Sequence, residues 1–502
     1  MTPADPRSRS TTRTRIRPFL AALLVLASPS VSAAQDAQDA PQIAKARAWL
    51  ETHVPEMMRE ARLPGFSVAV VKDGRTVYAQ GFGARDPKKN LPATPDTLYG
   101  IGSVTKSFVA VAILQLAEQG RLKLDDPVSR YVPLELGLPG KPITIRHLLT
   151  HSAGFPNLGT STILISRGLG TDTGIPMSSA ADFYRFVNGA KSEVRFAPGE
   201  RFFYCNAAWR MLGHVVQERS GMPFHRYVQE KVLAPLGMTR STLSTATLFA
   251  DADHLVPHRR GKDGPEAAAF PYPNPEDNPD FSFLAAAGGI ASSASEMTRY
   301  LIALIDQGRY PGGRLASPQA FEEMQSLQIE TGDGYFGRTG YGYGLSVTPG
   351  FLGHKMVSHG GSIAVSTAHL AFVPDARIGI VMMGNGPGLP YGTVAESVLA
   401  LLLGRDPGEA LPANGIRERM NRLVGEYATY RGLEKLKVSR RGGMLYMGEE
   451  EPDTPLIPED PTLVSTRFYT MSDGLRSPVE FEVGEDGSVI LIVGRDVYRR
   501  KG

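Results

Sequence analysis

The sequence contains a Ser-x-x-Lys pair, Ser103 and Lys106, whose residue types and spacing suit nucleophilic catalysis. A serine hydroxyl is a weak nucleophile until a neighbouring base takes its proton. Residues three apart on a helix share a face, so Lys106 can place its amine beside the Ser103 hydroxyl. Burial or a neighbouring cation can lower the pKa of a lysine enough for it to act as that base. Taken alone, the pair also fits an N-capping serine followed by a solvated lysine.

A second candidate pattern, Tyr204-Cys205-Asn206, follows about a hundred residues later. A tyrosine can relay protons, and an asparagine side chain can orient Lys106 and bind a substrate carbonyl or amide. The non-catalytic alternative for Tyr204 is a half-buried tyrosine packed at a helix start. A competing Tyr-x-Asn at 272–274 lies in a proline-rich segment, where we do not expect catalytic geometry.

The third pattern, His359-Gly360-Gly361-Ser362, leads into a predicted strand. Paired glycines at a strand edge let a substrate backbone approach closely. His359 can donate a hydrogen bond or, when charged, attract a carboxylate, although most histidines are structural. Ser362 is an alternative nucleophile because its surroundings resemble Gly-x-Ser-x-Gly, but no strand-to-helix context supports it.

These residues need a scaffold, and the sequence predicts strands at both ends of the first 400 residues with helices between them. Residues 65–84 predict a hairpin around Asp73-Gly74, and residues 366–385 predict two more strands. Residues 103–119 predict a helix that stops at Gly120. We therefore expect an α+β fold, with an antiparallel sheet built from both ends of the catalytic domain and an inserted helical lobe.

Two segments are expected to lack regular structure. Residues 245–282 are rich in Pro, Asp and Gly and predict a long loop, and residues 404–414 predict a linker. After the linker come short strand-like runs separated by Gly, Pro and Asp. The expected organisation is a catalytic domain over residues 40–405 and a small all-β domain over residues 415–502.

The first 33 residues predict a secretory signal peptide. An arginine-rich start, a short apolar run at 19–27 and the small residues Val31-Ser32-Ala33 follow the usual order. We therefore expect a periplasmic or secreted protein, with no stable membrane association after cleavage; an uncleaved signal anchor is the alternative. Removing this segment leaves 49 basic and 50 acidic residues, which gives no indication of a nucleic-acid partner. Cys205 is the only cysteine, so an internal disulfide is excluded.

The three patterns, in this order and at this separation, resemble the signature of penicillin-recognising serine enzymes. Four further segments resemble the same family: HLLTHSAG, APGERFFYCNAAWRMLG, PLGMTRSTL and AAAGGIASSASEMTRYL. Over roughly residues 45–400 the chain is similar to the serine β-lactamase-related superfamily, which includes class C β-lactamases, family VIII esterases and D-aminopeptidases of the peptidase S12 type. The resemblance implies a β-lactamase/transpeptidase-like α/β/α sandwich, followed by a lipocalin-like domain.

The resemblance also implies a role for each site residue. Ser103 matches the acylated nucleophile, Lys106 its proton acceptor, and Tyr204 the residue that shuttles protons to the leaving group and the deacylating water. The remaining matches bind substrate or form the oxyanion hole: Asn206, His359, Gly360, Gly361 and Ser362, with the backbone amides of Ser103 and Ser362 as oxyanion donors. We expect no cofactor, and no metal, because the ten histidines lack ligand spacing with an acidic partner.

One residue departs from the family pattern. Class C β-lactamases, which the chain resembles, carry a lysine at the position of His359. A histidine of ordinary pKa is largely neutral at pH 7 and holds a carboxylate less well. The sequence therefore predicts an exported serine hydrolase that acts through an acyl-enzyme on esters or on small amide or peptide substrates, D-amino-acid substrates included.

Other functions stay open at this point. One is β-lactamase or D-Ala-D-Ala carboxypeptidase activity on the same site. Another is a catalytically silent binding protein built on the same fold, which the complete set of Ser103, Lys106 and Tyr204 argues against. The sequence does not indicate an oligomeric state.

The first prediction separates the two candidate nucleophiles. We expect Ser103→Ala to abolish turnover of every substrate that the wild type accepts, because it removes the attacking oxygen. Ser362→Ala should retain most of the activity. Steady-state kinetics of both purified variants provide the measurement, and full activity in Ser103→Ala would contradict the assignment.

Overall fold

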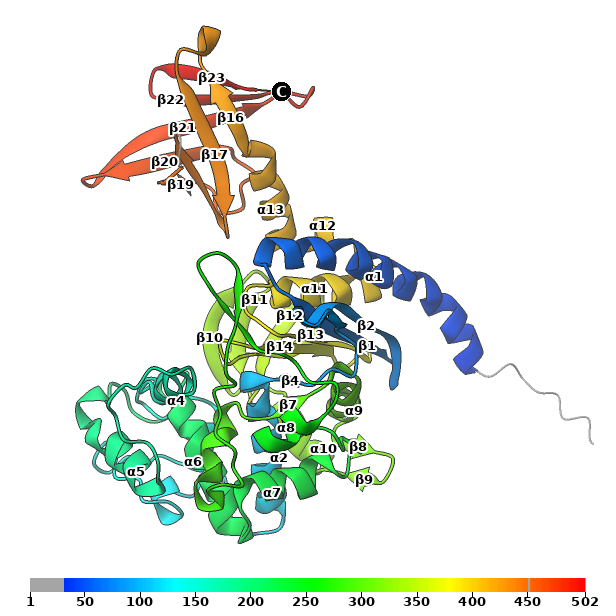
Figure 1. Cartoon of the computed structure of the whole chain (residues 1–502), viewed down its shortest axis with the longest axis vertical. Coiled ribbons are helices and arrows are strands. Elements are labelled where there is room, and N and C mark those ends of the chain that lie inside the picture. Colours follow the sequence, from blue (N-terminus) through cyan, green and yellow to red (C-terminus); the bar gives the residue numbers. More distant parts are fainter. Residues whose placement is uncertain (1–30, 450–451, 502) are drawn as a thin grey trace, which may run out of the picture. The chain divides into compact units, whose positions relative to one another are not determined.

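The computed structural model describes residues 31–449 and 452–501 (Figure 1). The chain divides into two compact units, Met1–Pro41 and Gln42–Gly502, and the description below concerns the second. Residues 1–30 of the predicted signal peptide lie outside the described residues. No helix in the described part of the chain is both long and apolar enough to cross a membrane.

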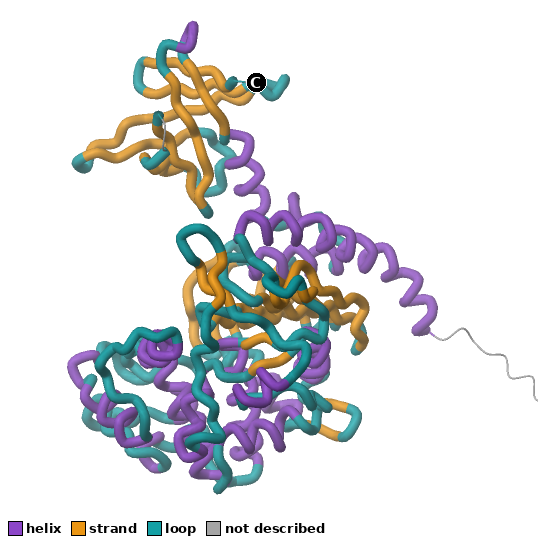
Figure 2. The backbone as a smooth tube through the Cα atoms, in the orientation of Figure 1, coloured by secondary structure: helices purple, strands orange, loops and turns teal. Residues whose placement is uncertain are grey.

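A nine-stranded antiparallel sheet lies at the centre of this unit (Figure 2). Its order is β10-β11-β12-β13-β14-β15-β1-β2-β3, so strands from both ends of the catalytic region lie side by side. The predicted hairpin at 65–84 and strand pair at 366–385 are confirmed, and β1 pairs with β15. The strands are β1 (Gly65–Lys72), β2 (Arg75–Asp86), β3 (Leu91–Pro92), β10 (Ile329–Gly334), β11 (Gly337–Tyr341), β12 (Ser346–Phe351), β13 (His354–Ser362), β14 (Thr367–Val373) and β15 (Ile378–Gly384).

Different helices cover the two faces of the sheet. Alternate residues of a strand point to opposite faces. The buried side chains of β1 therefore belong alternately to two apolar clusters, one on each face of the sheet. Phe66, Val68 and Val70 pack in one apolar cluster with α1 (Val31–Ala61) and α11 (Tyr391–Leu402). Ala69 and Val71 pack in the other cluster, with α2 (Thr105–Glu118) and α9 (Ala294–Ile305). This arrangement confirms the expected α/β/α sandwich.

A mainly helical lobe is inserted between β3 and β10, as expected. The predicted helix at 103–119 is confirmed as α2, which follows a 3-10 turn and is buried along most of its length. Gly120 lies in the left-handed region just beyond its end, as a helix stop requires. The other helices of the insertion are α3 (Ile145–Leu149), α4 (Thr160–Gly168), α5 (Ala180–Gly189), α6 (Asn206–Ser220), α7 (Phe224–Val228), α8 (Thr245–Ala250) and α10 (Pro318–Met324). Short strand pairs complete it: β4 (Tyr99–Gly100) with β7 (Ala291–Ser292), β5 (His258–Arg260) with β6 (Pro265–Ala267), and β8 (Arg309–Tyr310) with β9 (Gly313–Arg314).

The predicted loop and the predicted linker both contain regular elements, so the expectation of one long loop over 245–282 is wrong in part. Residues 245–282 hold α8, the β5–β6 hairpin and the start of a 3-10 helix, η5 (Pro279–Ala287). The expected linker holds α12 (Pro407–Ala410) and the start of α13 (Pro412–Leu423). Three of these helices begin with proline, whose fixed φ and missing N–H suit the first helical position. In these two segments, prolines therefore occur at the first residue of helices as well as in turns.

The C-terminal region forms a closed eight-stranded barrel, which confirms the expected all-β domain. Each strand pairs with the next and β16 closes on β23, the up-and-down order that lipocalins also have. Apolar side chains such as Tyr427, Phe468, Phe481 and Leu491 form its core. The strands are β16 (Gly425–Ala428), β17 (Lys435–Arg441), β18 (Met444–Gly448), β19 (Thr454–Pro458), β20 (Arg467–Ser472), β21 (Leu475–Val483), β22 (Val489–Val493) and β23 (Asp496–Arg500).

Candidate active site

Ser103 lies in the 3-10 turn η1 (Gly102–Val104), directly before α2, and its side chain is half-buried. Gly102 has a φ of +52°, a conformation that glycine adopts without strain. A Cβ atom on Gly102 would lie 2.5 Å from the backbone nitrogen of Ser362. A Cβ atom on Gly361 would lie 2.0 Å from the Ile101 carbonyl oxygen and 2.7 Å from the Ser103 nitrogen. The backbones of the nucleophile turn and β13 are therefore in direct contact.

The register of β13 explains how the turn reaches it. Strand β14 pairs with β13 through Ser362, whereas β12 pairs with it only as far as Ser358. The last residues of β13 are therefore unpaired on the β12 side, and η1 contacts this strand. The sequence suggested that the paired glycines admit a substrate backbone. The structure shows that Gly361 admits the protein's own nucleophile turn.

The amine of Lys106 is fully buried and lies within hydrogen-bond distance of three oxygens. Its Nζ is 2.9 Å from Ser103 Oγ, 2.8 Å from Asn206 Oδ1 and 2.8 Å from the carbonyl oxygen of Ala287. The last two oxygens only accept hydrogen bonds. A neutral amine has two hydrogens and one lone pair, so donation to these two directs the lone pair at Ser103.

The environment of Lys106 also favours this neutral form. Burial lowers the pKa of Lys106 well below the ordinary lysine value, and the positive charge of Arg210 lowers it further. An amine held in this state can accept the proton of the Ser103 hydroxyl. The structure thus brings together Ser103, Lys106 and Asn206, which the sequence predicted as partners.

Tyr204 lies close to the same amine, with Lys106 Nζ 4.9 Å from the centre of its ring. Burial raises the pKa of Tyr204, and a hydrogen bond with Ser103 partly opposes this shift. The phenol is therefore neutral at rest and can donate a proton. Lys106 and Tyr204 consequently suit opposite roles, the amine as base and the phenol as acid. Ser362, by contrast, is exposed, and its Oγ accepts a hydrogen bond from the Ala364 amide.

His151 supports Tyr204, a contact that the sequence did not indicate. The two rings stack with centres 4.1 Å apart, and His151 Nδ1 accepts a hydrogen bond from the Cys205 amide at 2.8 Å. His151 has a φ of +56°, an uncommon conformation for a residue with a Cβ. His151 was assigned no role from the sequence, although the HLLTHSAG segment that contains it already resembled the family. No cluster of three or more potential metal ligands occurs among the described residues.

His359 is buried, and both of its ring nitrogens have partners within the protein. The Gly360 carbonyl lies 2.5 Å from Nδ1 and only accepts, so Nδ1 carries the hydrogen. Nε2 then accepts from the Tyr341 hydroxyl at 2.9 Å. Burial lowers the pKa of His359 to about 3. The predicted substrate contact through a ring nitrogen does not fit this arrangement, because neither nitrogen is free.

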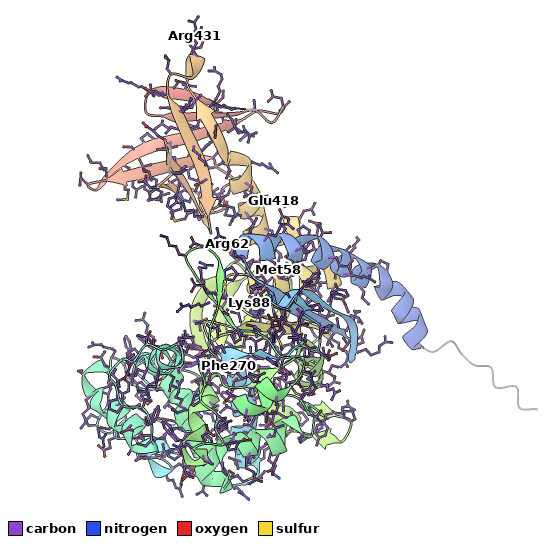
Figure 3. All side chains as sticks on the ribbon, viewed as in Figure 1. Met58, Arg62, Lys88, Phe270, Glu418 and Arg431 are labelled. Atoms are coloured by element: carbon purple, nitrogen blue, oxygen red, sulfur yellow. The ribbon has the colours of Figure 1, made fainter. Side chains whose placement is uncertain are left out.

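A pocket of about 480 Å³ lies beside the nucleophile turn. Tyr272 lines this pocket and also lies near the nucleophile turn. A Cβ atom on Gly288 would lie 2.8 Å from the Tyr272 hydroxyl and 3.3 Å from Gly102, so Gly288 is next to both residues. The Tyr-x-Asn at 272–274 was not expected to have catalytic geometry, but Tyr272 lies close to the nucleophile turn. Phe270, labelled in Figure 3, lines the same pocket. Its other apolar lining residues include Leu164, Met177, Phe281, Leu284 and Ala285.

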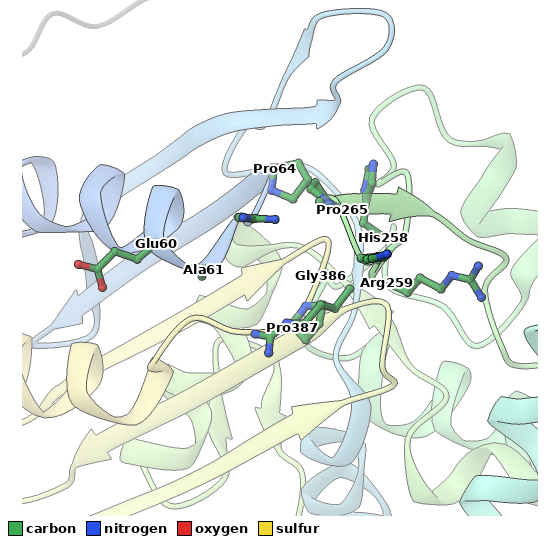
Figure 4. A pocket seen from close by; sticks show the side chains of 13 residues that line it. Glu60, Ala61, Pro64, His258, Arg259, Pro265, Gly386 and Pro387 are labelled. Carbon is green, nitrogen blue, oxygen red and sulfur yellow. The ribbon is translucent and has the colours of Figure 1, made fainter. Parts of the chain in front are cut away.

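A second pocket, of about 320 Å³, lies between the end of α1 and the β5–β6 hairpin (Figure 4). Several basic side chains line it, and one of these, Arg259, forms an ion pair with Glu266. A Cβ atom on Gly388 would contact both Arg260 and Ala61, the last residue of α1. Arg260 therefore lies near the C-terminal end of this helix, where the helix dipole favours a positive charge. None of the predicted site residues lines this pocket.

Comparisons with known proteins agree with this fold. The beta-lactamase family model matches residues 50–403, and the model of the Pab87 octamerisation domain matches residues 407–499. The octameric penicillin-binding protein homologue from Pyrococcus abyssi is 35% identical, with a TM-score of 0.82, over 90% of this chain and 99% of that one. Fold and matched residues define the class as that of the β-lactamase and penicillin-binding serine hydrolases. The chain belongs to the beta-lactamase family.

Two curated relatives are more distant or match less of the chain. A beta-lactamase of Yersinia enterocolitica is 24% identical over 66% of this chain and 84% of its own length. Protein flp of Staphylococcus aureus (strain COL) is 32% identical over 41% of this chain. The chain matches only 40% of the length of protein flp.

The contact between η1 and β13 predicts that a side chain added at Gly361 lowers activity, whereas one added at a glycine away from the site does not. Gly361→Ala should lower kcat/KM about a hundredfold, because the new Cβ forces β13 away from the Ser103 amide and disturbs the oxyanion donors. Gly392→Ala, in α11 and outside the site, is the control, since its Cβ would meet no atom within 4 Å. Ester hydrolysis and thermal melting of both variants provide the measurement. Equal activity in the two variants would contradict the proposed contact.

Proposed function

We propose that the protein is an exported serine hydrolase that forms an acyl-enzyme on Ser103. The observation that carries the proposal is the arrangement around Lys106. Two oxygens that can only accept lie at 2.8 Å from its Nζ, and the third neighbour, at 2.9 Å, is the Ser103 hydroxyl. A buried, neutral amine in this position is a general base for that hydroxyl.

The proposed reaction follows from these contacts. Lys106 takes the Ser103 proton as Oγ attacks the substrate carbonyl, and the Ser103 and Ser362 amides stabilise the oxyanion. The Tyr204 hydroxyl gives its proton to the leaving oxygen or nitrogen and regains one from the Lys106 ammonium. In deacylation, water attacks the ester and the protons pass back in the reverse direction.

We further propose that the substrates are esters or small amides or peptides, D-amino-acid compounds included, whose binding does not require a free carboxylate. His359 is neutral and both of its nitrogens are occupied, so it offers no charge to a carboxylate. Lys106 is held as the amine, and Arg210 is fully buried. The pocket beside Tyr272 is mainly apolar and suits an uncharged acyl or side-chain group.

A substrate panel tests this proposal. Purified protein should hydrolyse short-chain nitrophenyl esters and D-alanyl anilides, and it should hydrolyse a chromogenic cephalosporin at least tenfold less efficiently, because carboxylate binding is weak. Ser103→Ala is the control in every assay. Efficient cephalosporin turnover would instead support the β-lactamase alternative, and absence of all turnover would support a silent binding protein.

We propose that eight copies of the chain assemble through the C-terminal barrel. The proposal rests on the match to the octamerisation domain and on the 35% identity to the octameric Pyrococcus abyssi protein. Exposed apolar side chains support it, because large apolar patches mark association surfaces. Seven of the ten exposed large hydrophobic side chains among the described residues lie in this region: Tyr430, Leu433, Val464, Met471, Leu475, Val483 and Val497.

Light scattering coupled to gel filtration tests the assembly. The wild type should elute with eight times the subunit mass, and Leu475→Glu should shift the population towards smaller species because it places a charge in an apolar contact. Lys437→Glu, a charge change at another exposed barrel residue, is the control. A monomeric wild type would refute the proposal.

We also propose that residues 1–33 direct export to the periplasm or the medium. The support is the order of basic, apolar and small residues in the sequence.

A further inference from the structure

Arg210 is a fully buried arginine on α6, one helical turn after Asn206. Its guanidinium donates hydrogen bonds to Thr160 Oγ1 at 2.9 Å and Ser161 Oγ at 3.2 Å. Its Nε has no hydrogen-bond partner, and no carboxylate pairs with the side chain anywhere in the described part of the chain. A buried charge without a counter-ion is costly, because the interior solvates it poorly.

The surroundings of Arg210 are the groups of the active site. On a helix, residues four apart share a face, and Asn206 on that face accepts a hydrogen bond from Lys106. The positive charge of Arg210 acts on Lys106, Tyr204 and Tyr272. The titratable groups that face Lys106 from the surrounding elements are Tyr204, Cys205, Arg210, His151, His359 and Tyr272.

Of these groups, Arg210 alone carries a charge that opposes protonation of Lys106. Burial lowers the pKa of His151 and His359, so both rings are neutral. Burial raises the pKa of Tyr204, Tyr272 and Cys205, so these groups are neutral as well. Burial lowers the pKa of Arg210 as well. The ordinary pKa of arginine is so high, however, that the guanidinium keeps its proton over the working pH range. Its charge therefore acts on the Lys106 amine throughout the working range.

We propose that Arg210 is a positioning residue whose unpaired, buried charge holds Lys106 as the amine that accepts the Ser103 proton. The same charge favours release of that proton from the Lys106 ammonium once the leaving group departs. This inference rests on the proposed function of Ser103. It goes beyond that function by giving a reason why Lys106 is neutral before any substrate binds.

The test measures how fast a fluorophosphonate probe labels Ser103 as a function of pH. Labelling needs the deprotonated base, so its rate falls on the acid side as Lys106 becomes protonated. In Arg210→Met, Lys106 holds its proton more tightly, and this acid limb should move up by about one pH unit. Labelling on that limb is then about tenfold slower, and it recovers at alkaline pH.

Two further variants separate the charge from the hydrogen bonds. Arg210→Gln is a second neutral variant that keeps a donor for Thr160, and it should shift the limb in the same direction. Thr160→Val removes a hydrogen bond but keeps the Arg210 charge, and its limb should stay at the wild-type pH. Circular dichroism and thermal melting establish that each variant is folded.

The outcomes distinguish this inference from the proposed function. A rate that falls by the same factor at every pH in the neutral variants assigns Arg210 a structural role and overturns the inference. The inference is overturned as well if neither neutral variant folds while Thr160→Val does. A wild type that is not labelled at Ser103 refutes the proposed function instead.

Discussion

The hydrogen bonds of one buried amine hold the active site together. Lys106 Nζ meets oxygens from three parts of the chain: the turn before α2, the start of α6 and the end of η5. Each oxygen requires its element to be placed within a few tenths of an ångström, because longer or bent hydrogen bonds weaken steeply. The elements of the helical lobe are far apart in sequence, and together they position Lys106 for proton transfer from Ser103.

The sheet contributes the second constraint, which is steric. Glycines at 102 and 361 let the nucleophile turn and β13 touch through their backbones, and this contact sets the amides of Ser103 and Ser362 beside each other. Strand β13 lies within a nine-stranded sheet covered by helices on both faces, so its position is fixed by packing. A rigid strand and a buried helix suit an oxyanion site, since preorganised donors need no rearrangement during the reaction.

Much of this architecture could be predicted from the sequence, and what could not has identifiable causes. The strands around Asp73-Gly74 and Pro374-Asp375 followed from alternation and turn residues, and α2 followed from its apolar run and Gly120. The roles of His151, Tyr272 and Arg210 did not, because each depends on contacts between distant segments. The sequence predicted a substrate contact for His359, but it could not show that Tyr341 and the Gly360 carbonyl hold both ring nitrogens, because such partners are not evident from the local sequence.

The most direct test of the central claim is peptide mapping by mass spectrometry of protein quenched in acid during turnover of an activated nitrophenyl ester. A good leaving group makes formation of the acyl-enzyme faster than its hydrolysis, so the intermediate accumulates. We expect the added mass of the acyl group on the peptide that contains Ser103. An acyl group on a peptide with Ser362 but not Ser103, or turnover without any acylated peptide, would contradict the claim.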